Sequence, residues 1–523
     1  MPDIKELGGI LVNILLVCLS ALLFAAAFPK FSLSYCAFFC MIPFFAAIEL
    51  SGGPAGRLLT AAAWTVAHIA FTANWLFVAL ITHYGVSLST SLLFVGLFVF
   101  VPLFVLYSCF VFAYRLLKTD SLFFYAIIVP GLWVLVEFTK SRFSFLIPWI
   151  DIGYAALPFS HFVQVADIAG VYGVSFILVM INAVLWRFIL CGHCAVWRKQ
   201  VPLPGPWIRA NAACILILIA ALIVPSAYGI FRLNVLNKYG KARNVEHNEI
   251  RACVVQGSFS MTDRWSGMGF EHRLKTYLEL SAGKAGKGEK RLVVWPETVL
   301  NVSTMINDDL FKQLMKWFGK DSLLVSGGVS EEGRAVYNSA YLISGQGRLL
   351  RYDKHMLLPY AEAVPPIDLL GRYYSAPEHY SPGRTSLAIS APEATVGVSI
   401  CLEMLYPGFI RRSTAEGAQF LVNISNDSWF GDTSMPYIHF SAARMRAIEN
   451  RRYVVRAANS GISGIIAPSG HVMASIPLYL RKSAEADIQL RDGKSLYVRF
   501  GDWFILLLGF IIAILSVRTV IRS

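Results

Sequence analysis

Gly-Val-Ser-Ile-Cys-Leu-Glu, residues 397–403, is the stretch that decides how the second half of this chain folds. Thr395 to Ile400 is rich in β-branched side chains, which predicts a short buried strand, and a thiol and a carboxylate follow it directly. In α/β folds, active-site groups tend to lie just past the carboxyl ends of strands. We therefore expect Cys401 and Glu403 to lie at a functional edge of a sheet.

Two earlier segments end in the same way. Residues 292–295 are an apolar run that leads into Glu297, and residues 349–352 lead into Lys354. Each residue taken alone has an ordinary structural explanation, such as a helix-terminal carboxylate or a surface lysine. Together with Cys401 they supply a nucleophile, a base for its proton and a cation for a developing oxyanion. The hypothesis is a catalytic site of Glu297, Lys354 and Cys401.

The region from Ile250 to Leu490 alternates short apolar runs with helical patterns. Phe270 to Leu280 and Asp308 to Phe318 carry apolar residues at helical spacing, so these helices should pack onto a sheet. The pattern indicates an α/β fold with layers. The expected strands are Arg251 to Gln256, Arg291 to Trp295, Leu323 to Ser326, Thr395 to Ile400 and Phe420 to Ile424.

The rest of the chain predicts a polytopic α-helical membrane domain. Of the 523 residues, 56% are hydrophobic and 15% are charged, which is too apolar for a soluble protein. We expect a membrane domain at 1–231 with seven transmembrane helices, a globular domain at 232–500, and a C-terminal transmembrane helix with its tail at 501–523. The spans are Ile10 to Phe28, Tyr35 to Leu50, Leu58 to Ile81, Ser91 to Phe112, Phe123 to Val136, Phe162 to Leu185, Ala213 to Phe231, and Trp503 to Val517.

Basic residues predict the orientation. Lysines and arginines such as Arg57, Arg115 and Arg198 gather in the loops on the side of the N-terminus, which favours a cytoplasmic position for that side. Seven spans then place residues 232–500 outside the cytoplasm. Membrane orientation also explains the net charge of +13 better than a nucleic-acid partner does.

Neither a metal nor a cofactor is expected. Cys191-Gly-His-Cys194 has half the ligands of a closed zinc site and lacks a second pair. The chain has no glycine-rich phosphate loop. Its nine cysteines are scattered and predict no disulfide framework.

Three segments carry a family resemblance: residues 293–298, 352–355 and 397–403. In order and spacing they resemble the signature segments of the nitrilase, or carbon–nitrogen hydrolase, superfamily. Seven predicted spans before this domain and one after it narrow the resemblance to the apolipoprotein N-acyltransferases. Two departures are Leu402, where the family usually has an aromatic residue, and Ala361, where it has glycine.

The resemblance implies an α-β-β-α sandwich and assigns roles. Glu297 is the implied base, Lys354 the oxyanion stabiliser and Cys401 the nucleophile, with Glu362 as a second carboxylate beside the lysine. Two carboxylates should keep that lysine charged, and the lysine should lower the pKa of the thiol. The supporting or substrate-binding residues implied are Glu362, Glu403, Trp265, Trp429 and Leu402. For Glu403, holding a loop and contacting lipid both stay open.

The implied activity is acyl transfer from a phospholipid to the terminal α-amino group of a diacylglyceryl-modified cysteine in an apolipoprotein, through a thioester on Cys401. The implied location is the bacterial inner membrane, with the catalytic domain facing the periplasm and the lipid bilayer as a partner. One alternative is a membrane-anchored amidase or nitrilase that acts on a small periplasmic amide. Another is a non-catalytic transport or scaffold protein.

Overall fold

A computed structural model describes residues 4–142, 147–197, 204–242, 249–260, 269–282, 290–300, 308–359, 361–363 and 380–522. The chain divides into two compact units. The first unit is Met1–Arg232 with Asp502–Ser523, and the second unit is Leu233–Gly501. The second unit is therefore inserted into the sequence of the first.

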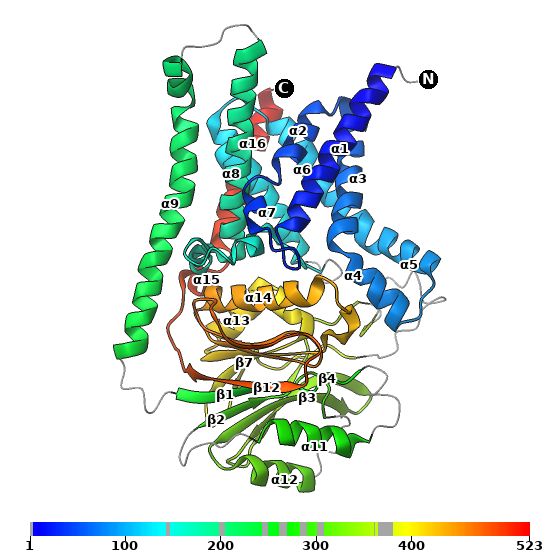
Figure 1. The fold of residues 1–523 in the computed structure, drawn as a ribbon, viewed down its shortest axis with the longest axis vertical. Coiled ribbons are helices and arrows are strands. Elements are labelled where there is room, and N and C mark those ends of the chain that lie inside the picture. The colour runs from blue at the N-terminus through cyan, green and yellow to red at the C-terminus, as the bar shows by residue number, and fades with distance from the viewer. Residues whose placement is uncertain are drawn as a thin grey trace. The chain divides into compact units, whose positions relative to one another are not determined.

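The first unit is built of helices (Figure 1). Among the residues that the structure describes, four helical stretches are long and apolar enough to cross a membrane, and a fifth is added if Gly53–Thr72 and Asn74–His83, bent by 64°, form one broken span. The eight spans and their sidedness stay predictions. The helices are α1 (Ile4–Ala26), α2 (Ile42–Leu50), α3 (Gly53–Thr72), α4 (Asn74–Phe77), α5 (Leu88–Val95), α6 (Val101–Leu117), α7 (Val129–Lys140), α8 (Ala166–Trp197), α9 (Pro204–Ala242), which runs on into the second unit, and α16 (Trp503–Arg522).

The segment predicted as the second span is not one continuous helix. It contains a 3₁₀ turn at Ser34–Phe38, and α2 begins only at Ile42. Pro43 lies in the first turn of α2, where its missing N–H costs nothing, so the proline begins a helix here and does not continue one.

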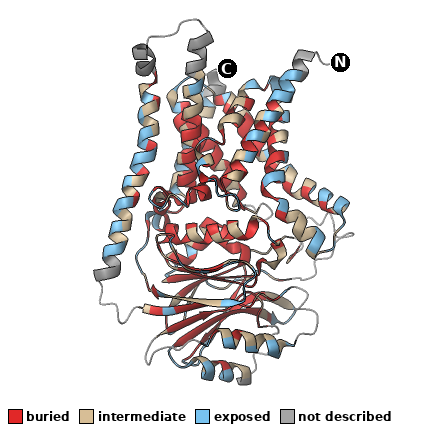
Figure 2. Cartoon of the chain, in the orientation of Figure 1, coloured by how far each residue is buried: buried red, intermediate tan, exposed pale blue. Residues whose placement is uncertain are grey.

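Helix α1 shows why this unit suits a bilayer. Leu11, Leu15, Leu19 and Leu22 lie one helical turn apart and are each between 46% and 58% exposed. Figure 2 shows the same division, with buried residues on the inner helices and exposed residues along α1 and α9. An apolar stripe of this length on the surface of a helix is stable in contact with hydrocarbon.

The second unit contains two six-stranded sheets. The first sheet has the order β12-β1-β2-β3-β4-β5, and the second has the order β11-β10-β9-β8-β7-β6. The strands of the first are β1 (Glu249–Gln256), β2 (Arg291–Val294), β3 (Ser322–Glu332), β4 (Ala335–Ser344), β5 (Leu349–Asp353) and β12 (Lys482–Gln489). Those of the second are β6 (Ala388–Ser390), β7 (Thr395–Ile400), β8 (Phe420–Ser425), β9 (Val454–Ala458), β10 (Ser463–Ile466) and β11 (Val472–Ile476).

Helices cover the outer face of each sheet. α11 (Phe270–Leu280) contacts β1, and α12 (Asp308–Phe318) contacts β3 and β4. On the other sheet, α13 (Pro407–Ala415) contacts β7, and α14 (Met435–Asn450) contacts β9 and β10, while the short α15 (Leu496–Phe500) contacts α13 and α14. The sheets face each other through β1 with β9 and β4 with β7. The predicted α-β-β-α sandwich is confirmed, and Figure 1 shows its layers.

The apolar side of α12 packs onto the sheet, as its periodicity predicted. Leu310, Phe311, Leu314, Met315 and Phe318 of α12 all pack against the cluster that includes buried Trp295. Leu314 is fully buried, which contributes about 1.5–3 kcal/mol, and the other four are partly buried. This core fixes the end of β2, which leads into Glu297.

Strand direction places the three predicted catalytic residues. β1, β2 and β3 run parallel, and β5 returns parallel to β3 because β4 is antiparallel to both. Glu297 follows β2, Lys354 follows β5, and Cys401 follows β7 of the other sheet. All three therefore lie just past the carboxyl end of a strand.

Candidate active site

Lys354 occupies the centre of the site. Its side chain is 2% exposed, and its Nζ lies 2.7 Å from Glu362 Oε1 and 3.6 Å from Glu297 Oε1. Burial lowers the pKa of a lysine, but here Glu362 and Glu297 outweigh that effect and hold the pKa of Lys354 well above its ordinary value. The ammonium is therefore a fixed positive charge between two carboxylates.

Asn338 on β4 connects the same two carboxylates. Its Nδ2 donates to Glu297 Oε1 at 2.7 Å and to Glu362 Oε1 at 3.0 Å. The other oxygen of Glu297, Oε2, accepts from the backbone N–H of Asn426 at 2.9 Å. Oε2 of Glu362 accepts from the N–H of Leu358 at 2.8 Å. Both carboxylates are thus held in fixed directions around the ammonium.

Cys401 begins the 3₁₀ segment η8 (Cys401–Leu405) with φ at 53°. A positive φ is rare for a residue with a side chain and often marks a functional turn. Burial raises the pKa of the Cys401 thiol, Glu297 raises it further, and Lys354 lowers it. The lysine acts in the expected direction, but the net change is a rise because burial is the larger effect. The resting thiol is therefore neutral and needs a base.

Glu403 is fully buried and ties the two strand ends together. Its Oε1 accepts from the backbone N–H groups of His355 and Met356 at 2.7 and 3.1 Å. Its Oε2 accepts from Tyr352 Oη at 2.8 Å and from Ile400 N at 2.7 Å. Of the two roles left open for Glu403, these four contacts favour holding the loop.

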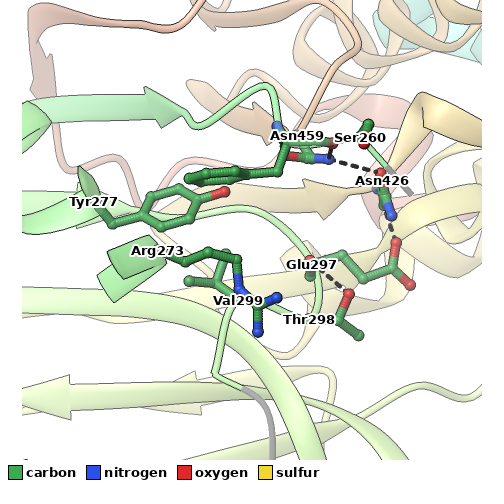
Figure 3. Close-up of a pocket in the computed structure, with 9 residues that line it drawn as sticks. Ser260, Arg273, Tyr277, Glu297, Thr298, Val299, Asn426 and Asn459 are labelled. Atoms are coloured by element: carbon green, nitrogen blue, oxygen red, sulfur yellow. Dashed lines mark hydrogen bonds between the residues drawn. The ribbon is translucent and has the colours of Figure 1, made fainter. Parts of the chain in front are cut away.

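A pocket opens beside Glu297 (Figure 3). Asn459 Nδ2 lies 3.3 Å from Asn426 Oδ1, which connects the pocket wall to the residue that holds Glu297. Arg273 of α11 lies along the same pocket. Glu297 lines this pocket, whereas Lys354, Glu362 and Cys401 are not among its lining residues. The lining residues are Phe259, Ser260, Arg273, Tyr277, Glu297, Thr298, Val299, Asn426 and Asn459.

The structure brings Glu297, Lys354 and Glu362 into direct contact, with Cys401 in the field of all three charges. Leu402 is 3% exposed within η8, so its side chain belongs to the core.

The two predicted tryptophans have different outcomes. Trp429 is half-buried in the 3₁₀ segment η9 (Asp427–Phe430), directly after the loop that holds Glu297. Trp265 lies outside the described residues. The supporting role of each stays a prediction.

Three residues of the site were missed by the sequence reasoning. Asn338 bridges the two carboxylates, Asn426 orients Glu297, and His439 of α14 lies 2.8 Å from the carbonyl oxygen of Cys401. Asn338 gave a signal, because together with Ser339 it is an uncharged polar residue in a strand whose other residues from Tyr337 to Ile343 are apolar or aromatic. Buried amides in such positions are kept for their hydrogen bonds.

Two protein families match segments of this chain. Residues 251–497 match the carbon–nitrogen hydrolase family, and residues 20–184 match the apolipoprotein N-acyltransferase N-terminal domain. Among solved structures, a nitrilase-superfamily protein of Saccharomyces cerevisiae is 19% identical and covers 46% of this chain and 90% of its own, with a TM-score of 0.35.

The curated relatives extend over both units. An apolipoprotein N-acyltransferase of Geobacter metallireducens is 32% identical over 72% of this chain and 70% of its own length. An apolipoprotein N-acyltransferase 2 of Treponema denticola is 29% identical over 77% of this chain and 78% of its own. The first relationship is close enough, and covers enough of both proteins, that the chain belongs to the apolipoprotein N-acyltransferase family.

Proposed function

We propose that this chain transfers a fatty acyl group from a phospholipid to the terminal α-amino group of diacylglyceryl-cysteine in apolipoproteins. Membership of the family supports lipoprotein N-acylation, and the several apolar helices fit a membrane protein. The observation that carries the chemistry is the buried Lys354 ammonium held between Glu297 and Glu362 at the strand ends, in the field of Cys401.

In the first step, the Cys401 sulfur attacks the ester carbonyl of the phospholipid. Glu297 takes the thiol proton as the carbon–sulfur bond forms, and the carbonyl oxygen becomes an oxyanion. Lys354 stabilises that negative charge. The carbon–oxygen ester bond then breaks, Glu297 returns the proton to the departing oxygen, and a lysophospholipid leaves a thioester on Cys401.

In the second step, the amine of the lipoprotein attacks the thioester carbonyl. Glu297 takes a proton from the attacking nitrogen, the carbon–sulfur bond breaks, and the proton returns to the sulfur. The product is an amide, and Cys401 is a neutral thiol again. Because the two substrates use one site in turn, ping-pong kinetics are expected.

The geometry explains how Glu297 can act as a base although it lies close to the Lys354 ammonium. Lys354 lies closer to Glu362 than to Glu297, at 2.7 against 3.6 Å, so Glu362 is the main counter-ion of the ammonium. Glu297 is left to accept a proton, while its position is fixed by Asn338 and Asn426. The removal of one negative charge when Glu297 is protonated also favours the thiolate that forms beside it.

The proposed location is the bacterial inner membrane, with the second unit facing the periplasm. Basic residues on the side of the N-terminus support this orientation. The phospholipid donor and the lipoprotein acceptor are both anchored in a bilayer, so an enzyme with apolar helices in its first unit can meet them there. The partners proposed are therefore a phospholipid donor, a diacylglyceryl-modified apolipoprotein and the bilayer itself.

A membrane-anchored amidase is not favoured. It would use the same three residues, but the match of residues 20–184 to the apolipoprotein N-acyltransferase N-terminal domain has no explanation in an enzyme for small amides. The acyltransferase and amidase hypotheses differ in whether an acyl group from a phospholipid is transferred to Cys401.

The test is an acylation assay on the full-length protein in phospholipid nanodiscs without an acceptor. The acyl chain of the donor carries the label, and the readout is protein-bound label that hydroxylamine removes. We expect label on the wild type and none on Cys401→Ala. An apolipoprotein acceptor should then remove the label as an amide product. A wild type without label, in nanodiscs whose donor is accessible, would favour the amidase.

A further inference from the structure

A histidine contacts the backbone of the proposed nucleophile. His439 of α14 is fully buried, and its Nε2 lies 2.8 Å from the carbonyl oxygen of Cys401. Its Nδ1 lies 3.1 Å from Asp427 Oδ1. Neither residue has a part in the chemistry of the two steps above.

The imidazole is fixed from behind by a buried network. Asp427 Oδ2 accepts from Arg456 at 2.7 Å, and Asp427 Oδ1 accepts from Ser425 Oγ at 2.7 Å. Arg456 in turn donates to Asn423 and to the carbonyl oxygen of Ile462. Burial raises the pKa of Asp427, but Arg456 and His439 outweigh this and hold it below its ordinary value, so the aspartate is charged.

Cys401 needs such support because of its backbone. Its φ of 53° is unfavourable for a residue with a side chain and persists only where the surroundings hold it. The contact from His439 reaches the carbonyl of that residue. Asn423 Nδ2 also reaches the carbonyl oxygen, but at 3.4 Å, so His439 makes the stronger contact.

We propose that His439 is a positioning residue for the nucleophile, and that Asp427 and Arg456 are its support. The Cys401 carbonyl oxygen and the charged Asp427 are both acceptors, so the ring makes both hydrogen bonds with an N–H on each nitrogen. Burial and Arg456 lower the pKa of His439, whereas Asp427 raises it. The N–H on Nε2 donates to the Cys401 carbonyl and fixes the turn from which the thiol reaches the acyl carbonyl. The same peptide unit carries the Leu402 N–H, and a donor on its oxygen strengthens that N–H as a donor. This inference rests on the proposed role of Cys401 as nucleophile.

Two amide substitutions separate the two contacts of the ring. Glutamine at position 439 can place its amide nitrogen near the position of Nε2 and keep the donor to Cys401. Asparagine is shorter and can place its amide nitrogen near Nδ1, which keeps the contact to Asp427 and loses the one to Cys401. The pair is matched in chemistry, so a difference between them reports which contact matters.

The experiment measures single-turnover acylation of the full-length protein in nanodiscs with labelled phospholipid at several densities. We expect His439→Gln to acylate within about threefold of the wild-type rate. His439→Asn should be about 10- to 100-fold slower at saturating donor, because a small displacement of a reacting atom costs that much. The donor density that gives half the maximal rate should not change, since His439 does not touch the lipid.

The outcomes are distinguishable. Equal rates for the two variants, or a faster His439→Asn, would overturn the positioning role while leaving the nucleophile in place. Label on Cys401→Ala would instead overturn the nucleophile, and the inference with it. If neither histidine variant folds, Asp427→Asn is the alternative test, because it weakens the contact between Asp427 and Nδ1 of His439. It should slow acylation at unchanged half-saturation, and a wild-type rate would refute the proposal.

Discussion

Glu403→Gln should separate the ends of β5 and β7. The wild-type carboxylate accepts four hydrogen bonds, two on each oxygen. Glutamine has one acceptor oxygen, so in either orientation its NH₂ group faces two donors. Hydrogen bonds to a charged group contribute about 1.5–3 kcal/mol each, so two lost bonds cost about 3–6 kcal/mol. The change also lets the Cys401 turn shift relative to Lys354.

Two measurements follow the effect. For a unit of this size, 1 kcal/mol lowers the unfolding temperature by roughly 2–4 °C, so we expect a fall of at least roughly 6 °C in nanodiscs. Single-turnover acylation should slow by about 100-fold. The control is Glu416→Gln, because Glu416 is exposed and accepts from Ser386 Oγ and Leu387 N at 2.9 and 3.0 Å. Wild-type stability and a wild-type rate in Glu403→Gln would refute the reasoning.

The remaining predictions concern the charges around the thiol. Alkylation of Cys401 by iodoacetamide should still rise with pH above 9, because burial raises the pKa of the thiol and only the thiolate reacts. Glu297→Gln should alkylate faster than wild type at pH 8, since Glu297 also raises that pKa, although it should form no thioester; slower alkylation would contradict the electrostatics. Lys354→Met should lose both reactions, because Lys354 lowers the thiol pKa and stabilises the oxyanion. Asn338→Leu should slow acylation about tenfold or more, because it removes the donor shared by Glu297 and Glu362; an unchanged rate would show that Lys354 and the backbone N–H groups of Asn426 and Leu358 hold them without it.

Strong local patterns made the layers of the second unit predictable. The predicted helices Phe270 to Leu280 and Asp308 to Phe318 have the bounds of α11 and α12, because their apolar residues recur at helical spacing. The strand β3 continues to Glu332, well past its predicted end at Ser326. Its second half is stabilised by pairing with β4, and the sequence of one strand does not reveal its partner.

The sequence predicted those residues of the candidate site that have chemically reactive side chains, and it missed the residues that hold them in place. Cys401, Glu297 and Lys354 follow strand ends in the sequence, and the fold brings those ends together. Asn338 and His439 lie in the middle of a strand and of a helix, far from those ends in sequence. The sequence also could not predict that the pKa of Cys401 is raised, because the direction of the change depends on how deeply the thiol is buried.

The pairing of β1 with β12 affects the order in which the second unit can fold during synthesis. The two strands pair antiparallel, from Glu249 with Gln489 to Gln256 with Lys482. The first strand of the sheet in sequence can therefore complete its pairing only after the last strand has been synthesised. A ribosome has produced all three proposed catalytic residues, and every other strand that the structure describes, before β12 emerges. Until then one edge of β1 has unpaired backbone groups, which is a hazard for aggregation. A nascent chain that stops before residue 482 therefore carries the chemistry of the enzyme without a closed sheet to hold it.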